Sequence, residues 1–432
     1  VGSGYPELRL LSVGISMLGL AAIYVLARRL LGSEAALWTL AWQAVSLWPL
    51  FYSRRAIRGI LLPPLAALAG YFFVRGLETK ASPPLSPPRT DHGGEEGLAP
   101  RTVHRGEKEP RALSQVHRDT EERDARAGGA QRFPLPPRRL PMRASARPEA
   151  GQGWGLVWPW IAGGVALAGG LYTYAASRAL PLFFVLYLGY LALFHRETVR
   201  ARWRGILLFG LVTALLVAPL AAYLIANPEE RMRQINEPLA RLQAGDPLPL
   251  LRNSLRALGM FTAIGDPHWR QFVANTPVFG PLAATLFYGG LLLSIWRWRR
   301  PTHAFLLLWL PMALLPGMLS EGAPNFLRPI AAVVVTYSFP ALAAVELRAW
   351  LRRRLGGLAW GRAAQYGALA LLVALLGLHA GRTYEGYFVR WPRHPDARFA
   401  YSSTLLEVSR YLDRAPKIAR VVLSGHFPSD LD

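Results

Sequence analysis

The chain alternates between long apolar runs and one long polar stretch, and this contrast limits what it can fold into. From about residue 78 to residue 153, charged residues, proline, glycine and serine dominate, and aliphatic clusters are almost lacking. Such a segment cannot bury enough apolar surface to offset the entropy that a chain loses on folding. We therefore expect residues 78–153 to form a disordered loop between two membrane-embedded parts.

The apolar runs on either side approach the roughly 20 residues that a helix needs to cross a bilayer. The chain is 52% hydrophobic with 14 Trp and 16 Tyr, which suits lipid-facing helices with aromatic belts better than a water-soluble core. The predicted fold class is an all-α polytopic membrane protein with about ten transmembrane helices. The predicted spans are 9–27, 35–52, 56–74, 155–175, 180–194, 205–226, 281–296, 303–320, 329–346 and 364–381.

Basic residues sort the connecting loops into two sets. The net charge is +22, but the arginines form short clusters in alternate loops rather than one basic face, so no nucleic-acid partner is expected. By the positive-inside rule the clustered loops, including 78–153, are cytoplasmic. The strong preference for arginine over lysine indicates a bacterial genome, and hence the bacterial inner (plasma) membrane. The loops predicted to face the periplasm or cell exterior are 1–8, 53–55, 176–179, 227–280, 321–328 and the residues after 382.

The large outer loop 227–280 contains an amphipathic pattern. Leu251, Leu255 and Leu258 share a helical face that points away from Arg252 and Arg256. A helix with this pattern is typical of the membrane interface.

The carboxyl-terminal segment changes character again. Thr404 and Glu407 form a capping-box pattern that opens a helix, and residues 419–423 have the composition of a strand. We therefore expect the start of a small outside α/β domain. The predicted organisation is 1–77 (three spans), 78–153 (the loop), 154–381 (seven spans) and 382–432 (the partial outside domain).

Several arginines lie at the predicted outer ends of the spans, although the positive-inside rule expects arginines mainly at the cytoplasmic ends. An arginine near a bilayer is costly unless it is paired or hydrated, so the set indicates an anionic partner such as a lipid phosphate. Alternatively, each arginine reaches lipid headgroups or pairs with a local acid. The set comprises Arg54, Arg55, Arg58, Arg178, Arg270 and Arg328.

Four motifs accompany these arginines, in the order Tyr52-Ser53-Arg54, residues 172–178 (YTYAASR), residues 265–270 (GDPHWR) and residues 323–328 (APNFLR). Together they resemble bacterial membrane glycosyltransferases of family 39, the protein O-mannosyltransferase-like type. The resemblance implies transfer of a sugar from a polyprenyl-phosphate donor to a glycan, lipid or protein acceptor on the outer face. It implies donor-phosphate binding by Arg54, Arg178, Arg270 and Arg328, with Tyr172 and Tyr174 as pocket aromatics.

The catalytic base is harder to assign. The resemblance places an acidic base in the first outer loop, between the first and second spans, and this chain opens at the end of that loop, apparently after a first span. We therefore expect the base upstream of residue 1. Glu7 is the sole acid in the part of that loop that this chain contains, and we interpret it as a solvent-exposed loop residue. Asp266 is the best remaining acid: it could orient an acceptor or a metal, or cap its own turn and pair with Arg270. His268 beside it fits an interface residue.

Two other functions stay open at this point. One is a transporter or flippase for a lipid-linked anionic substrate, and the other is a truncated inactive homologue. Transporters commonly carry internal repeats and ionisable residues at mid-membrane, whereas the charges here lie at the outer ends and no repeat is evident. The sequence names no certain cofactor and leaves a divalent metal open. Because cysteine is absent, thiolate metal sites are excluded.

Overall fold

The computed structural model describes residues 5–55, 57–78, 152–228, 236–320, 322–358, 360–401 and 403–414. Within these ranges every regular element is helical, and many helices are long and apolar. The chain is therefore an all-α polytopic membrane protein, as predicted. Apart from its first residue and its last two, the predicted loop 78–153 lies outside the described residues, as does the predicted strand at 419–423.

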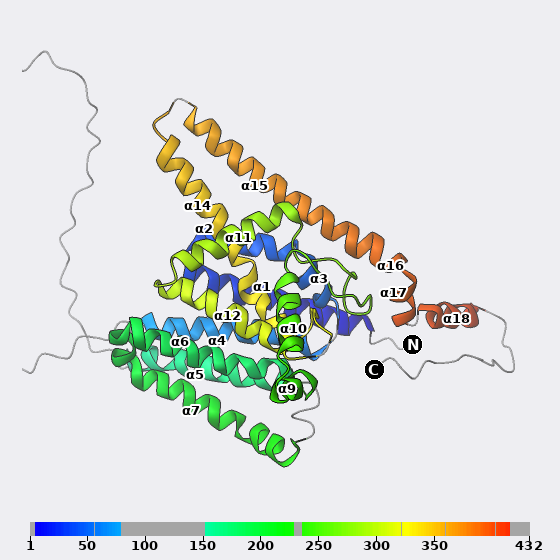
Figure 1. The fold of residues 1–432 in the computed structure, drawn as a ribbon, viewed down its shortest axis with the longest axis horizontal. Helices are drawn as coiled ribbons and strands as arrows, with labels where there is room; N and C mark the ends of the chain where they lie inside the picture. The colour runs from blue at the N-terminus through cyan, green and yellow to red at the C-terminus, as the bar shows by residue number, and fades with distance from the viewer. Residues whose placement is uncertain are drawn as a thin grey trace, which may run out of the picture. The chain divides into compact units, whose positions relative to one another are not determined.

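Figure 1 shows how the elements follow one another along the chain. In order they are α1 (Tyr5–Leu31), α2 (Ser33–Ala44), α3 (Leu47–Ser53), η1 (Arg58–Leu61), α4 (Leu62–Glu78), α5 (Gln152–Thr173), η2 (Ala175–Ala179), α6 (Leu180–Phe194), α7 (Arg196–Ala226), α9 (Asn236–Gln243), α10 (Leu248–Gly259), α11 (Pro281–Trp296), α12 (Pro301–Met318), η3 (Ile330–Ala332), α13 (Val333–Thr336), α14 (Ser338–Leu355), α15 (Gly361–Tyr384), η4 (Glu385–Arg390), α16 (Trp391–Arg393), α17 (Pro395–Ala400) and α18 (Ser403–Arg414).

Among the described residues, eight helical stretches are long and apolar enough to cross a membrane, and each coincides with a predicted span. The other two predicted spans are not among these eight stretches, one because it is short and one because it is divided. Residues 281–296 form α11, a helix of 16 residues. Residues 35–52 are divided between α2 and α3, because the chain leaves the helix at Val45 and Ser46. The Ser46 hydroxyl donates to the Trp42 carbonyl at 2.6 Å, a local bond that competes with the regular helical pattern.

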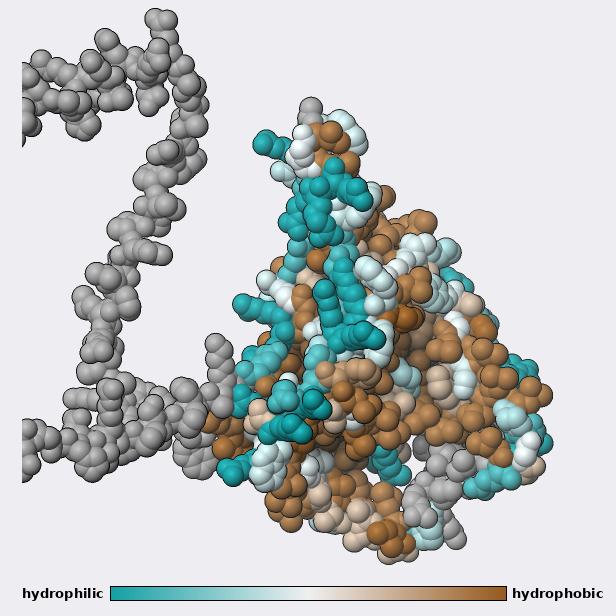
Figure 2. Space-filling view, turned by 60° about the vertical axis from the view of Figure 1, so that its left-hand side comes forward, coloured by the Kyte–Doolittle hydropathy of each residue, from teal (hydrophilic) through white to brown (hydrophobic). Residues whose placement is uncertain are grey.

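One end of the helices collects the basic loops. Arg29 and Glu78 form an ion pair of 2.7 Å between the ends of α1 and α4. Arg348 of α14 pairs with Glu34 of α2. These bonds bring together connections that the sequence predicts to be cytoplasmic. Figure 2, in which this end is turned toward the reader, shows hydrophilic residues along it and hydrophobic residues over the adjoining flank.

Aromatic side chains fill the interior between the helices. The buried Phe73 ring of α4 makes edge contacts with Trp160 of α5 and Phe209 of α7, with centroids 5.7 and 5.1 Å away. Elsewhere the helix backbones approach closely: a Cβ on Gly290 of α11 would lie 1.9 Å from the Phe339 carbonyl oxygen of α14. Small residues permit such close packing in membranes, so a larger side chain at residue 290 would force α11 and α14 apart.

The last long helix extends beyond its predicted end at residue 381. Helical structure continues from α15 through η4 and α16 to Arg393. The described part of the carboxyl-terminal segment then contains the short helix α17 and the helix α18, which covers the residues predicted to start a helix at Thr404. The segment therefore returns to the end of the helices opposite the basic loops (Figure 1).

Candidate functional site

The end opposite the basic loops brings several of the motif segments together. Gly59 lies where they meet: a Cβ there would be 3.2 Å from the Leu327 side chain and 4.0 Å from the Tyr174 ring. The indole N–H of Trp48, on α3, donates to the Phe326 carbonyl at 2.9 Å. The loops after α3, α5 and α12 therefore share one junction.

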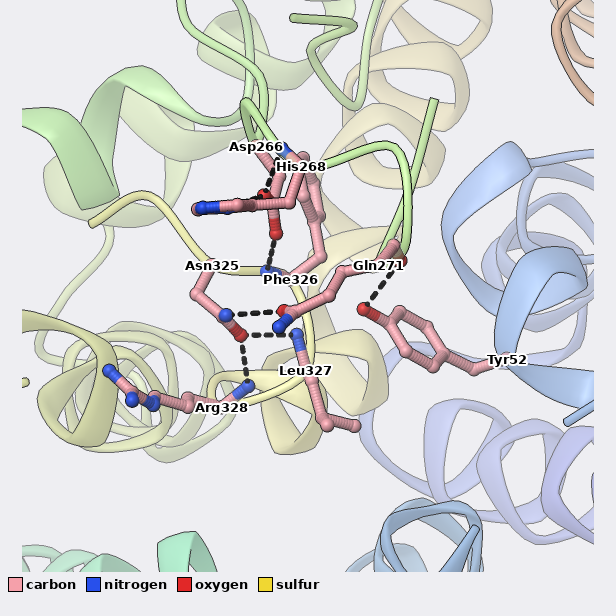
Figure 3. A network of polar contacts seen from close by, with 8 residues as sticks. All are labelled: Tyr52, Asp266, His268, Gln271, Asn325, Phe326, Leu327 and Arg328. Carbon is pink, nitrogen blue, oxygen red and sulfur yellow. Dashed lines mark hydrogen bonds and ion pairs between the residues drawn. The ribbon is translucent and has the colours of Figure 1, made fainter. Parts of the chain in front are cut away.

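Asp266 adds the loop between α10 and α11 to this junction. Its carboxylate is fully buried. One oxygen accepts the backbone N–H of His268 at 2.9 Å and lies 3.0 Å from its Nδ1, and the other accepts the Phe326 N–H at 3.3 Å (Figure 3). Burial raises the pKa of this carboxyl, while the bonds from His268 and Phe326 oppose the rise. The partner is thus His268 rather than Arg270, and the carboxylate ties two loops together.

A second set of bonds runs beside Asp266. The Asn325 amide group donates to Gln271 Oε1, and Asn325 Oδ1 accepts the backbone N–H groups of Leu327 and Arg328 at 2.9 and 3.1 Å. In Figure 3 the side chain of Arg328 points away from Asp266. Asn325 therefore shapes the turn that presents Arg328.

Three consecutive carbonyls of the same loop, at residues 269–271, accept hydrogen bonds from distant aromatic side chains. Trp391 donates to the first at 2.9 Å, Tyr401 to the second at 3.0 Å and Tyr52 to the third at 3.0 Å. The loop is thereby fixed against both α3 and the carboxyl-terminal segment.

The loop also needs a glycine at its start. A Cβ on Gly265 would lie only 2.1 Å from the backbone nitrogen of Thr276. Asn275 has a φ of 57°, a left-handed value that asparagine tolerates better than most residues, and its N–H donates to the Asp266 carbonyl at 2.8 Å. The backbone conformation of this loop therefore explains the glycine of the motif at residues 265–270.

Arg54 and Arg55 lie over aromatic rings. The Arg54 guanidinium carbon is 5.1 Å from the ring centre of Phe388 and 5.5 Å from that of Tyr387. The Arg55 guanidinium carbon is 5.5 Å from the ring centre of Tyr401. Cation–π contact engages the face of a guanidinium, whereas anion binding uses the N–H groups at its edge. The two uses are compatible.

The other predicted arginines occupy different surroundings. Arg328 is half-buried near Tyr174, since its positive charge opposes the rise that burial causes in the pKa of that tyrosine. Arg178 and Arg270 have exposed side chains. The structure thus brings Arg328 to the junction near Gly59 and leaves Arg178 and Arg270 at the exposed surface.

The two predicted pocket aromatics face different neighbours. Tyr172 is 52% exposed, and its hydroxyl donates to the Leu216 carbonyl of α7 at 2.9 Å. Tyr174 follows the end of α5 in an extended conformation and turns toward Gly59. Only Tyr174 lies at the junction.

An apolar cavity of about 370 Å³ opens beside Arg54. Tyr52 and Ser53 line it together with Arg54, while α1, α3, α4 and residues 330–333 supply apolar walls. Val13 and Ile23 of α1 both line it, and ten residues of helix correspond to about 15 Å. The cavity therefore extends from the arginine into the apolar interior.

Other predicted site features are less developed. Among the described residues, no group of three or more His, Asp and Glu is placed to hold a metal ion. Glu7 is an exposed residue in the first turn of α1. His268 is bonded to Asp266 and 59% of its side chain is exposed.

The sequence did not single out Gln271, Tyr387, Trp391 or Tyr401. Their roles depend on contacts between distant positions of the sequence, from the 54 between Gln271 and Asn325 to the 346 between Tyr401 and Arg55. The one available signal was local: tyrosines and tryptophan recur between Tyr384 and Tyr401, directly after an apolar helix.

No protein-family model and no curated protein matches the chain. Among solved structures, the oligosaccharyltransferase of Archaeoglobus fulgidus tethered to an acceptor peptide is similar, with a TM-score of 0.49, 13% identity and coverage of 89% of this chain and 44% of that chain. Its apo form has a TM-score of 0.42, 13% identity and coverage of 95% and 47%. The chain spans less than half the length of these structures, and the likeness is too weak to assign a fold family.

Proposed function

We propose that the chain is a membrane glycosyltransferase that takes a sugar from a polyprenyl-phosphate donor and transfers it to an acceptor on the outer face of the bacterial plasma membrane. The observation that carries the proposal is the apolar cavity with Arg54 in its lining. An isoprenoid chain needs an apolar groove that starts at membrane depth, and its phosphate needs cations where the groove ends. The cavity and Arg54 offer both.

The chemistry requires little from the protein beyond placement and charge. The acceptor hydroxyl oxygen forms a bond to the anomeric carbon of the sugar, the bond from that carbon to the phosphate oxygen breaks, and the polyprenyl phosphate leaves with the electron pair. A base takes the hydroxyl proton. The leaving phosphate gains negative charge, so guanidinium groups fixed beside it lower the barrier.

Within this proposal the residues have graded roles. Arg54 binds the donor phosphate at the cavity, Arg55 reinforces the positive charge beside it, and Arg328 with Tyr174 faces the sugar side of the junction. Arg178 and Arg270, which do not line the cavity, contact the donor or acceptor only at the margin. Asp266 is a positioning residue, because its buried carboxylate holds the loop that carries Gln271 rather than facing a substrate.

The test is binding of a polyprenyl-phosphate-linked sugar to the purified protein in detergent. Loss of a hydrogen bond to a charged group weakens binding by about 1.5–3 kcal/mol, or roughly one to two factors of ten, which is the expected effect of Arg54→Ala. Arg54→Lys should recover only part, because an ammonium lacks the two-pronged geometry of a guanidinium.

Arg58→Ala is the matched control, since Arg58 opens η1 shortly after Arg54, is also exposed and is not among the residues that line the cavity. It should leave binding unchanged. Equal affinity of the unaltered chain and Arg54→Ala would refute donor binding at this cavity. Tight binding that is never followed by sugar transfer, but by movement of the lipid-linked sugar across vesicles, would favour the transporter instead.

A further inference from the structure

A second basic cleft lies beside α10, away from the cavity at Arg54. Its volume is about 290 Å³, and its lining includes Arg252, Asn253 and Arg256 of α10 with Asp246 of the preceding loop. Residues four apart on a helix lie on the same face, so the two guanidinium groups point to one region.

Neither arginine has its charge matched within the part of the chain that the structure describes. Neither takes part in an ion pair or hydrogen bond among the described residues. The nearby acid Asp246 is engaged elsewhere: one oxygen accepts the Leu248 N–H at 3.1 Å, and the other lies 3.9 Å from Arg241. The cleft therefore presents two guanidinium groups and one carboxylate, a net positive charge, to whatever enters it.

The adjoining face of α10 is apolar and exposed. Leu248, Leu251, Leu255 and Leu258 have exposed fractions between 49% and 67%. On the other side the helix is anchored, because Ala257 is buried and the Asn253 amide donates to the Ser320 carbonyl at 3.0 Å. A leucine stripe of this size facing water would be costly, because apolar surface is favoured away from water.

The orientation of α10 relative to the spanning helices indicates what its leucines face. In Figure 1 α10 runs across the direction of α4, α5 and α6, which belong to the stretches able to cross a membrane. A helix that lies across the spans, with leucines on one face and arginines beside them, is placed as interfacial helices are, with its apolar side toward acyl chains.

We propose that α10 lies in the outer lipid–water interface and that Arg252 and Arg256 bind the phosphate of an anionic phospholipid. The leucine stripe covers the acyl chains of the same lipid layer. Positive charge next to an apolar stripe is complementary to an anionic lipid, which carries its phosphate directly above its chains. This proposal does not depend on glycosyl transfer.

The test uses the absence of cysteine from the sequence. A fluorescent label at Leu255→Cys is the only thiol label in the full chain, and bromine-bearing lipids quench it on contact. In vesicles of phosphatidylcholine with phosphatidylglycerol, brominated phosphatidylglycerol should quench the label with roughly tenfold or greater preference, given about 1 kcal/mol per arginine near an anionic surface. Combining the label with Arg252→Gln and Arg256→Gln should abolish the preference, whereas the Arg→Lys pair should retain most of it.

The control label is Leu371→Cys, on the exposed face of α15, where both lipids should quench equally. Three outcomes would overturn the proposal. Absence of quenching by either brominated lipid would mean that another protein surface, such as a second copy, covers the leucines. Equal quenching by the two lipids at residue 255 would remove the phosphate site. Loss of the preference when millimolar inorganic phosphate is added, with vesicles intact, would show that the cleft takes free phosphate rather than lipid.

Discussion

Arginines lie over aromatic rings at both ends of the helices, as Arg75 over Trp158 and Arg54 over Phe388 do, but the carboxylates beside them differ. At the end with the basic loops several arginines also meet carboxylates: Arg29 pairs with Glu78, Arg348 with Glu34 and Arg297 with Glu346. At the other end Arg54 and Arg55 lie over aromatic rings. Asp266, the buried acid at that end, is bonded to the N–H groups of His268 and Phe326.

The difference shows what each end is suited to do. Arginines that already have carboxylate partners can set topology and fix helix ends, but they attract an added anion only weakly. Arginines that lie over rings and have no carboxylate beside them keep their positive charge available to an added anion. The end with Arg54 is therefore the one suited to a phosphate.

The largest expected effect concerns which side of the membrane each end occupies. Single cysteines at Ala263→Cys and Glu197→Cys, both exposed and at opposite ends, allow labelling with a membrane-impermeant maleimide. By the positive-inside rule, the residue 263 variant should label nearly fully in intact cells and the residue 197 variant only after lysis. A fully external label on both positions, or the reverse pattern, would break the assignment of the site end to the outer face.

The next effect compares one acid from each end. Asp266→Ala leaves the part-buried N–H of His268 and the buried N–H of Phe326 without an acceptor, which should cost about 3 kcal/mol of stability. Glu346→Ala removes a partly exposed ion pair, worth about 1 kcal/mol or less. Denaturant unfolding in detergent, followed by tryptophan fluorescence, measures both. A cost for Glu346→Ala that equals or exceeds that for Asp266→Ala would mean that the buried carboxylate does not hold the two loops.

Asp266 should also make the stability of the protein depend on pH. The folded pKa of Asp266 lies above its ordinary value of 3.8, so between these two values the folded state binds more protons than the unfolded state. Stability then falls as pH rises through that window. Asp266→Asn cannot titrate, so the advantage of the unaltered chain over this variant should be greatest at the acidic end and shrink with rising pH. An advantage that grows with pH would show that the folded pKa is lowered instead.

Much of the helical frame follows from the sequence because its causes are local. Runs such as 205–226 are apolar for long enough to span a bilayer, and the arginine clusters at 297–300 and 348–354 mark alternate loops. The exception is 35–52, where the Ser46 hydroxyl bonds to the Trp42 carbonyl and the helix breaks within a run that is mostly apolar in composition. Hydropathy is averaged over many residues, so it does not reveal a helix break caused by a single hydrogen bond.

The candidate site could be predicted only in part, because its geometry is set by distant segments. The sequence pointed to Arg54, Arg328 and Asp266, and the structure brings their loops together. It could not show that Trp391, Tyr401 and Tyr52 donate to successive carbonyls of one loop. Nor could it show that Tyr172 turns to α7 while Tyr174 turns to Gly59, since two neighbours at a helix end look alike in sequence.

The smallest expected effect lies at the end with the basic loops. Glu34→Gln removes the carboxylate that pairs with Arg348, and because the two side chains are 39% and 29% exposed, the loss should be only about 0.2–1 kcal/mol. Salt near 1 M should lower the stability of the unaltered chain toward that of Glu34→Gln, since screening weakens exposed pairs. The stability cost of Asp266→Ala should persist in the same salt, because buried hydrogen bonds are screened much less. Unfolding curves at 0.1 and 1 M salt compare the two variants directly. A salt-insensitive loss above 2 kcal/mol for Glu34→Gln would show that this end, too, depends on a buried charge network, and the contrast between the two ends would fail.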